Sequence, residues 1–203
     1  DTNADGSADQ TWTRTYDGNG YEISVEHDSD GDGVANRLVT ITYDSNGCQL
    51  SYIVDTNGDG QINSDETFTC DSDGNRLTHV QDTNGNGVTD VVENYTLNAY
   101  GQRTNLSKDS NNDGTIDLEV DYTFDNEGKL LSVNMNNNNA IDITTYSFDN
   151  NGYMVSREED TNGDGVAESV KTYTNDGDGY PISESVDTNN DGASDIVTTL
   201  TYI

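Results

Sequence analysis

Basic side chains are scarce in this sequence of 203 residues, which has 8 Lys and Arg against 39 Asp and Glu and a formal net charge of −31. Nucleic acids and anionic membrane surfaces are bound by basic faces, so this balance argues against both as partners. Long apolar runs are also missing, and a membrane-spanning helix needs about 20 predominantly apolar residues in a row. We therefore expect no nucleic acid partner and no membrane insertion.

Apolar residues and proline are scarce too, at 30% of the chain and one residue respectively. Low hydrophobicity with high charge is typical of disordered chains. Here, however, Asp, Asn and Gly recur at fixed intervals, which disorder does not explain. The sequence shows no Ser–His–Asp set, phosphate loop or zinc cluster, and its two histidines, His27 and His79, fall at non-equivalent repeat positions. We expect both to be structural and the segment to have no enzymatic activity.

An internal repeat of 27 residues organises the chain, and such a period is typical of repeat architectures. Its acidic phrases begin at Asp1, Asp28, Asp55, Asp82, Asp109, Asp160 and Asp187. The predicted units of this single array are 1–27, 28–54, 55–81, 82–108, 109–135, 136–159, 160–186 and 187–203. The sixth unit is three residues short and has "NNNNAID" in place of the acidic phrase, and the eighth is truncated.

Each unit has the pattern of a β-hairpin when its residues are numbered from 1 to 27. Positions 10–16 and 21–27 alternate between apolar and polar residues, as strands do. Between them, positions 17–20 read "DxxG", with Asn98 in place of the Asp in unit four, and the Asp suits a turn's first residue because its side chain caps the following amides. Position 20 is Gly in all seven units that reach it, as a turn with positive φ requires. The pattern predicts apolar columns at positions 14, 16 and 23, hydroxyl columns at 15 and 24, and position 12 near the core edge. We expect position 16 to pair with 21, and 10 with 27.

Two all-β architectures fit this repeat. The first is an elongated array of 27-residue β-hairpin units in an antiparallel meander or spiral, and the second is a two-sheet parallel β-solenoid. Hairpins repeat every two strands, about 10 Å, whereas solenoid coils repeat every 4.8 Å or so. Because closely stacked acidic loops would repel one another, the loops favour the meander, and the solenoid stays open as the alternative.

The phrases "TITYDSNG", "DYTFDNEG" and "TYSFDNNG" cover the end of the first strand and the turn. They resemble the YD repeats of the Rhs family, whose hairpins wind into a β-spiral. The match is a short motif over positions 12–23 of most units, and the Arg common after the family's turn is mostly missing. The resemblance implies hairpins and no catalytic activity.

The stretch "DTNGDGQINSDE", residues 55–66, matches the calcium loop of an EF-hand. Side chains at positions 1, 3, 5 and 9 and the carbonyl at 7 can surround a calcium ion when Gly at 6 allows the bend. The flanking residues read as strands, so we interpret the loops as calcium staples between strands, similar to thrombospondin type 3 and dockerin loops. Position 9 is the expected closing ligand, and Glu66 and Glu93 at position 12 are additions.

We predict seven Ca2+ sites, one in every acidic phrase, and expect calcium to be needed for folding or rigidity. Their predicted ligands are Asp1, Asn3, Asp5 and Asp9; Asp28, Asp30, Asp32 and Asn36; Asp55, Asn57, Asp59, Asn63 and Glu66; Asp82, Asn84, Asn86, Asp90 and Glu93; Asp109, Asn111, Asp113 and Asp117; Asp160, Asn162, Asp164 and Glu168; and Asp187, Asn189, Asp191 and Asp195.

Cys48 and Cys70 are the two cysteines, at position 21 of unit two and position 16 of unit three. In the meander they oppose each other on neighbouring strands, so we predict a disulfide. In the solenoid they also approach each other, so the bond does not decide the fold. A disulfide together with loops of the kind that bind millimolar calcium indicates a location outside the cell.

These observations predict a secreted or cell-surface structural protein, a calcium-stiffened stalk, spacer or filament subunit. Its partners would be neighbouring repeats or other copies of itself. The alternative is an adhesin or a module that binds ice or a glycan through the Thr and Ser face, since pairs such as Thr40 and Thr42 resemble the T-x-T arrays of ice-binding proteins. The plainer interpretation of these columns is a solvated strand face with cross-strand hydroxyl bonds.

Overall fold

The computed structural model describes residues 8–138 and 140–201, in which every regular element is a β-strand. Asp1, Asn3 and Asp5, three of the predicted ligands of the first loop, lie outside the described residues. Across the described part of the chain, no helix is long and apolar enough to cross a membrane. The strands are β1 Thr11–Tyr16, β2 Glu22–Asp28, β3 Arg37–Tyr43, β4 Gln49–Asp55, β5 Ser64–Cys70, β6 Arg76–Asp82, β7 Val91–Leu97, β8 Arg103–Asp109, β9 Leu118–Phe124, β10 Leu130–Asn137, β11 Ala140–Phe148, β12 Met154–Asp160, β13 Ser169–Asn175, β14 Pro181–Asp187 and β15 Ile196–Thr199.

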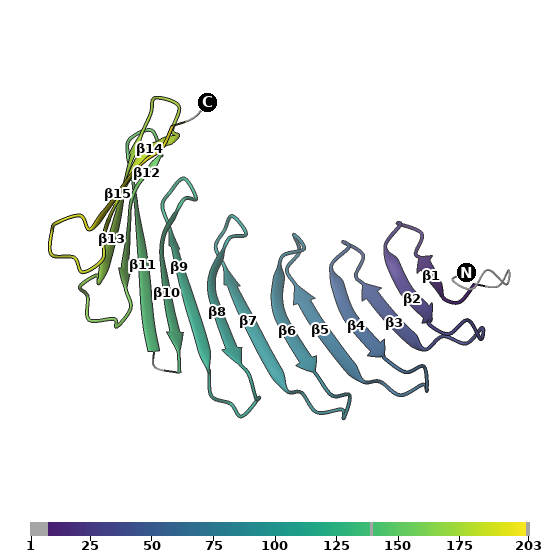
Figure 1. Ribbon diagram of the computed structural model, residues 1–203. Coiled ribbons are helices and arrows are strands. Elements are labelled where there is room, and N and C mark those ends of the chain that lie inside the picture. The colour runs from purple at the N-terminus through teal and green to yellow at the C-terminus, as the bar shows by residue number, and fades with distance from the viewer. Residues whose placement is uncertain (1–7, 139, 202–203) are drawn as a thin grey trace. The chain divides into compact units, whose positions relative to one another are not determined.

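The strands lie in the sheet in the order of the chain (Figure 1). The pairings from β1 to β7 and from β9 to β15 are all antiparallel. This confirms the meander of tandem hairpins, and the alternative of a parallel two-sheet solenoid is wrong. The chain divides into two compact units, Asp1–Thr96 with Lys108–Ile116 and Leu97–Ser107 with Asp117–Ile203.

The hairpin turns are held by the Asp at position 17. In unit three the Oδ1 atom of Asp71 accepts the amides of Asp73 and Asn75, both at 2.9 Å, and the Asp71 carbonyl accepts the amide of Gly74 at 3.1 Å. Gly74 has a φ of 84°, a conformation that costs glycine little and other residues more. The sequence prediction of an Asp-capped turn with Gly at position 20 is confirmed.

The strand register differs from the prediction by two residues along most of the hairpin. Thr42 pairs with Ser51 and Tyr43 with Gln49, so Leu50 at position 23 is an extra residue on its strand. Position 12 therefore pairs with position 27, not position 10, and position 16 pairs with 22 rather than 21. One residue of this difference comes from the turn, which is closed by positions 16 and 22, and the other comes from a β-bulge next to it. Leu50 is 38% exposed, so position 23 is not the core column that we expected.

The core of the first compact unit lies on the sheet face that carries positions 12 and 14 of the repeat. Val39, at position 12, is 1% exposed and packs with Val25, Ile41 and Val54. Position 14 is buried as predicted at Ile41 and Phe68, whereas position 12, which we expected near the core edge, is buried at Val39 and Val120. The opposite face carries cross-strand hydroxyl pairs at positions 15 and 24. They are Thr42 with Ser51, Thr69 with Thr78 and Thr123 with Ser132.

Side chains at position 21 fasten each hairpin turn to the next one. Tyr21 stacks on Tyr43 with ring centroids 4.9 Å apart, and Lys129 lies over the ring of Phe148 at 4.8 Å. At the equivalent positions Cys48 and Cys70 form the predicted disulfide. The same contact explains a second need for glycine at position 20, because a Cβ on Gly47 would lie 2.2 Å from the hydroxyl of Tyr21.

Replacing Asp71 by Ala is expected to destabilise the hairpin of β5 and β6, and more at neutral pH than in acid. The hydrogen bonds from the side chain and amide of Asn75 and from the amide of Asp73 outweigh burial and lower the pKa of Asp71. A lowered folded pKa means that the stabilisation is present above the ordinary pKa of about 4 and is lost as the pH falls through the lowered value. Urea unfolding at neutral and at acid pH measures the difference in unfolding free energy between the wild type and the alanine variant at each pH.

Asp71→Asn is the matched control for this substitution. In unit four Asn98 occupies the same position, and its Oδ1 atom accepts the amides of Tyr100 at 2.9 Å and Gln102 at 3.0 Å. The amide variant should therefore keep most of the stability that the alanine variant loses. Equal losses of stability in the alanine and asparagine variants would contradict this account of the turn. So would a stability difference between the wild type and the alanine variant that is larger in acid than at neutral pH.

Candidate metal centres

The acidic phrases form the loops that join one hairpin to the next. The Asp at position 1 is the last residue of β2, β4, β6, β8, β12 or β14, so the sheet fixes its backbone. These six residues are 6–9% exposed, and they are Asp28, Asp55, Asp82, Asp109, Asp160 and Asp187. The strand end therefore fixes where each loop begins, with a nearly buried Asp at position 1.

The carboxylate at position 1 accepts backbone amides from its own loop. In loop three the Oδ1 atom of Asp55 accepts the amides of Asn57 at 3.1 Å and Gly58 at 2.7 Å, and its Oδ2 atom accepts that of Gly60 at 2.8 Å. Burial alone would raise the pKa of Asp55, but these backbone amides together outweigh it and lower the pKa. The pKa values of Asp28, Asp82 and Asp160 are lowered for the same reason. These side chains are thus anionic at neutral pH.

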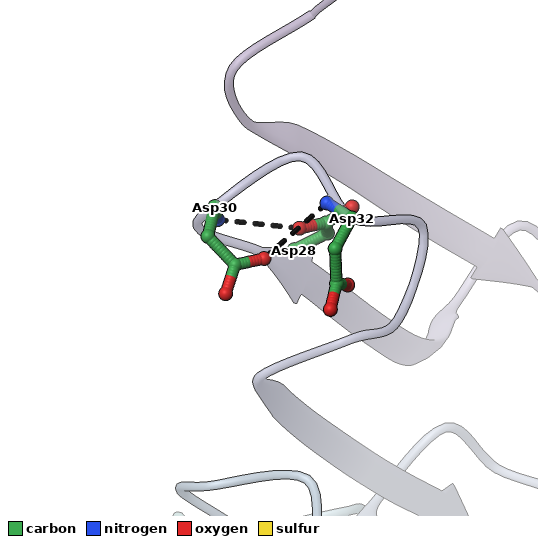
Figure 2. Close-up of side chains that lie close together, drawn as sticks. All are labelled: Asp28, Asp30 and Asp32. Atoms are coloured by element: carbon green, nitrogen blue, oxygen red, sulfur yellow. Dashed lines mark hydrogen bonds between the residues drawn. The ribbon is translucent and has the colours of Figure 1, made fainter.

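Two loops bring three carboxylates together closely enough to hold a metal ion. In loop two, oxygens of Asp28, Asp30 and Asp32 all lie within 4.8 Å of one another, around the bend shown in Figure 2. In loop seven, oxygens of Asp160, Asp164 and Glu168 do the same. Carboxylate oxygens in such a group are the ligands that hard divalent cations prefer.

The remaining loops have the same bend with Asn at position 3. In loop three the side-chain amide of Asn57 donates to Asp59 at 3.0 Å, which places the two predicted ligands side by side. In loops four, five and eight, Asp82, Asp109 and Asp187 accept the amide of the glycine at position 6. Positions 3 and 5 are likewise adjacent in these loops, where the amide at position 5 donates to the oxygen of Asn84, Asn111 or Asn189.

Position 9 braces the start of the loop, a contact that the sequence analysis missed. In loop three the Oδ1 atom of Asn63 accepts both the amide and the hydroxyl of Thr56, at 2.6 and 2.8 Å. The same pairs form between Ser29 and Asn36, Thr83 and Asp90, Thr161 and Glu168, and Thr188 and Asp195. The signal was the Ser or Thr at position 2 of every acidic phrase. The role of position 9 as a ligand stays a prediction.

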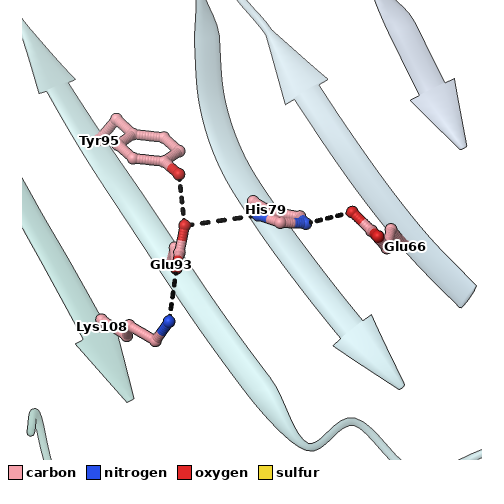
Figure 3. A network of polar contacts seen from close by, with 5 residues as sticks. All are labelled: Glu66, His79, Glu93, Tyr95 and Lys108. Atoms are coloured by element: carbon pink, nitrogen blue, oxygen red, sulfur yellow. Dashed lines mark hydrogen bonds and ion pairs between the residues drawn. The ribbon is translucent and has the colours of Figure 1, made fainter. Parts of the chain in front are cut away.

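Glu66 and Glu93, at position 12, lie on β5 and β7 and contact His79 on β6 between them (Figure 3). The Nε2 atom of His79 is 2.7 Å from Glu66, and its Nδ1 atom is 3.4 Å from Glu93. Lys108 donates to Glu93 at 2.9 Å, and Tyr95 donates to it as well. Among the described residues, no group of three His, Cys, Asp or Glu ligand atoms within 4.8 Å of one another joins either Glu to a loop. Their part in calcium binding stays a prediction.

His79 and Glu93 belong to a polar network on the core face. The ring of His79 stacks on that of Phe68 with centroids 4.7 Å apart, which gives this histidine the structural role that we expected. Burial alone would raise the pKa of Glu93, but hydrogen bonds from Tyr95, Lys108 and His79, with the charge of Lys108, outweigh it and lower the pKa. Glu93 is therefore an anion that its neighbours neutralise.

Unit six replaces the acidic loop by a tight connection between β10 and β11. Asn137 pairs with Ala140, and Asn138 has a φ of 49°, as the residues of two-residue hairpin loops require. For the first loop the described ligand is Asp9 alone, and for loop five Asp117 accepts the amide of Asn138 at its carbonyl. The acidic loops that are described from position 1 onward are thus loops two to five, seven and eight.

No family model matches this sequence, and no curated protein matches it. Solved structures do resemble the fold. The Tc holotoxin pore of Photorhabdus luminescens matches 93% of this chain and 9% of that chain, with 16% identity and a TM-score of 0.64. The TcdB2–TccC3 complex without its hypervariable C-terminal region matches 88% of this chain and 10% of that chain, with 16% identity and a TM-score of 0.55.

These similarities concern the fold, because identities of 16% leave the loops and side chains to be judged on their own. The chain corresponds in length to about a tenth of the toxin chains that it resembles. The tandem hairpins suggested by the YD-like phrases are therefore confirmed as architecture, and the chain is an all-β array of hairpin repeats.

Proposed function

We propose that this chain is a calcium-stabilised structural repeat protein that acts outside the cell as a stalk, spacer or filament subunit. The observation that carries the proposal is the repeated loop, in which an anionic Asp at position 1 is fixed at a strand end beside the side chains at positions 3 and 5. Its partners would be neighbouring repeats or further copies of the chain, and catalysis has no part in this role.

Calcium suits these loops better than magnesium does. Calcium accepts six to eight oxygen ligands in flexible geometry, whereas magnesium demands a near-ideal octahedron and keeps several waters. The loops offer a carboxylate at position 1, a carboxylate at position 5 in every loop but loop four, which has Asn86, an Asn or Asp at 3, and backbone carbonyls. This is a mixture of oxygens without a fixed octahedral arrangement. Bound divalent ions would also offset part of the formal charge of −31, which otherwise opposes the compact state.

The disulfide between Cys48 and Cys70 supports a location outside the cytoplasm, since disulfides persist in oxidising compartments. The similarity to a stretch of the Tc holotoxin pore adds an analogy of fold, in which hairpin repeats form part of a longer chain. Both points support a structural role, and neither identifies the assembly.

Isothermal titration of the full chain with calcium tests the proposal. We expect seven ions per chain, one in each acidic phrase, with dissociation constants of about 10⁻⁴–10⁻³ M, as in other extracellular modules. In the variant Asp59→Ala, loop three should lose its ion, because Asp55 would remain as the one carboxylate among positions 1 to 9, and Glu66 contacts His79.

The matched control is Asp73→Ala, which removes one exposed carboxylate from the turn of the same unit. It should leave the stoichiometry unchanged. If both variants reduce calcium binding equally, the ions are attracted by the overall negative charge and the loops are not sites. If the wild-type chain takes up no calcium at all, the proposal fails.

A further inference from the structure

Loops two, three, four, five and eight contact the loop before them through the residue at position 4. A Cβ atom on Gly58 would lie 2.0 Å from the carbonyl oxygen of Ala35, at position 8 of the preceding loop. The same holds for Gly85 and Ile62 at 2.0 Å, and for Gly31 and Ala8 at 2.4 Å. Glycine is therefore required there for close approach to a neighbouring loop as well as for its positive φ.

Two loops make this contact with asparagine instead. The Nδ2 atom of Asn112 donates to the carbonyl of Thr89 at 3.1 Å, and that of Asn190 donates to the carbonyl of Ala167 at 2.9 Å. Both asparagines have positive φ, at 52° and 51°. The same carbonyl at position 8 is thus contacted closely by a glycine or hydrogen-bonded by an asparagine, which are the residues that tolerate this conformation best.

The contact places the predicted ligand positions of one loop beside the hydrogen bonds between positions 2 and 9 of the preceding loop. In loop three the amide of Gly58 is held by Asp55, and Gly58 lies between the predicted ligands Asn57 and Asp59. Its contact in loop two, Ala35, precedes Asn36, whose oxygen accepts the amide and hydroxyl of Ser29. The predicted ligand positions of loop three therefore lie next to the residues that connect the two ends of loop two.

The tight connection of unit six interrupts this series. A Cβ atom on Gly163, at position 4 of loop seven, would lie 2.7 Å from the Cγ2 atom of the Ile141 side chain and not against a loop carbonyl. Loop eight in turn contacts loop seven through Asn190.

We propose that position 4 couples neighbouring loops, so that ordering one loop orders the loop before it, in two separate series. The first series contains loops one to five, and the second contains loops seven and eight. The coupling rests on these contacts alone, whereas its effect on calcium affinity also rests on the proposed function. Charge repulsion acts in the opposite sense, because a calcium ion bound in one loop weakens the attraction of the adjacent loop for a second calcium ion. That effect is screened at about 1 M salt, where the Debye length is about 3 Å.

Hydrogen exchange measured on the full chain against free calcium tests the coupling, at low and at high salt. The variant Gly58→Ala places a Cβ against the Ala35 carbonyl, and Gly58→Asn supplies the side chain that makes this contact in loops five and eight. In the alanine variant, loop two should need about 2- to 30-fold more calcium for half-protection. In the asparagine variant that calcium requirement should stay close to the wild-type value, and loop seven should be unchanged in both variants.

Asn112→Ala is the second test, since it removes the hydrogen bond to Thr89 without adding an atom and without supplying the glycine that makes this contact in loops two to four. It should loosen loop four, whose Thr89 carbonyl loses its donor. If calcium slows hydrogen exchange of the loops in the wild type, but the exchange of loops two and four is the same in these variants as in the wild type, the coupling is refuted and the proposed function stands. If calcium protects no loop, the proposed function fails. Calcium-free exchange then decides the coupling, which faster exchange in loops two and four supports and unchanged exchange overturns.

Discussion

Adding about 10 mM calcium to the calcium-free chain is expected to raise its melting temperature by about 15 °C or more. This concentration is about 10 to 100 times the dissociation constant of a typical extracellular calcium module. Each filled loop then stabilises the folded state by about 1.5–3 kcal/mol. In repeat proteins the stabilities of neighbouring units add approximately, so the six loops described from position 1 onward together contribute about 8 kcal/mol or more.

Calorimetry at constant ionic strength measures this effect. Sodium chloride is the necessary control, because a chain with a net charge of −31 gains stability from any salt that screens its self-repulsion. Magnesium at the same concentration is the second control, and we expect a much smaller rise with it, since it prefers to keep its waters. A melting temperature that rises equally with all three salts would show that screening, and not loop binding, stabilises the chain.

The sequence was sufficient for the architecture because its signals are local and repeated. Asp at position 17 and Gly at 20 define a turn, and each appears with its bonds in the structure, as at Asp71 and Gly74. The spacing of Cys48 and Cys70 defined their opposition on neighbouring strands, and the disulfide follows from it. Alternation then identified the core and hydroxyl faces.

The register could not be predicted, for a physical reason. Moving one strand by two residues keeps every side chain on its face, so alternation cannot distinguish pairing of position 27 with 10 from pairing with 12. The turn and the bulge next to it each contribute one residue to this difference, and Leu50, the extra residue of the bulge, is exposed. Val39 was placed near the core edge because position 12 has mixed residues along the chain, whereas in its own unit it is the most buried residue.

The loop contacts were missed because they depend on the bent loop and not on its ligands. The Ser or Thr at position 2 and the Gly or Asn at position 4 were visible in the sequence, but each also suits an ordinary turn. Once the loop is bent, Thr56 faces Asn63 and Gly58 reaches Ala35. The match of residues 55–66 to an EF-hand also placed Glu66 among the ligands, although the sheet directs its carboxylate to His79.

Replacing both Cys48 and Cys70 by Ser is expected to lower the stability of the oxidised chain by about 3 kcal/mol, because the disulfide closes a separation of 22 residues. In a chain of this size that loss corresponds to a fall in melting temperature of about 6–12 °C. Reductant should lower the melting temperature of the wild type by a similar amount and leave the serine variant unchanged.

The structure offers a matched replacement for the disulfide, since Tyr21 and Tyr43 stack at the equivalent positions one hairpin earlier. A variant with Tyr at both positions 48 and 70 should recover part of the lost stability without any response to reductant, because an aromatic pair contributes about 0.5–1.5 kcal/mol beyond its buried area. Hydrogen exchange of β4 and β5 should localise the change to these two strands. If reductant leaves the wild-type melting temperature unchanged, or if the tyrosine and serine variants melt together, the contacts at position 21 do not fasten the hairpins. The array would then be held together by the backbone hydrogen bonds between its strands and by the contacts between its loops alone.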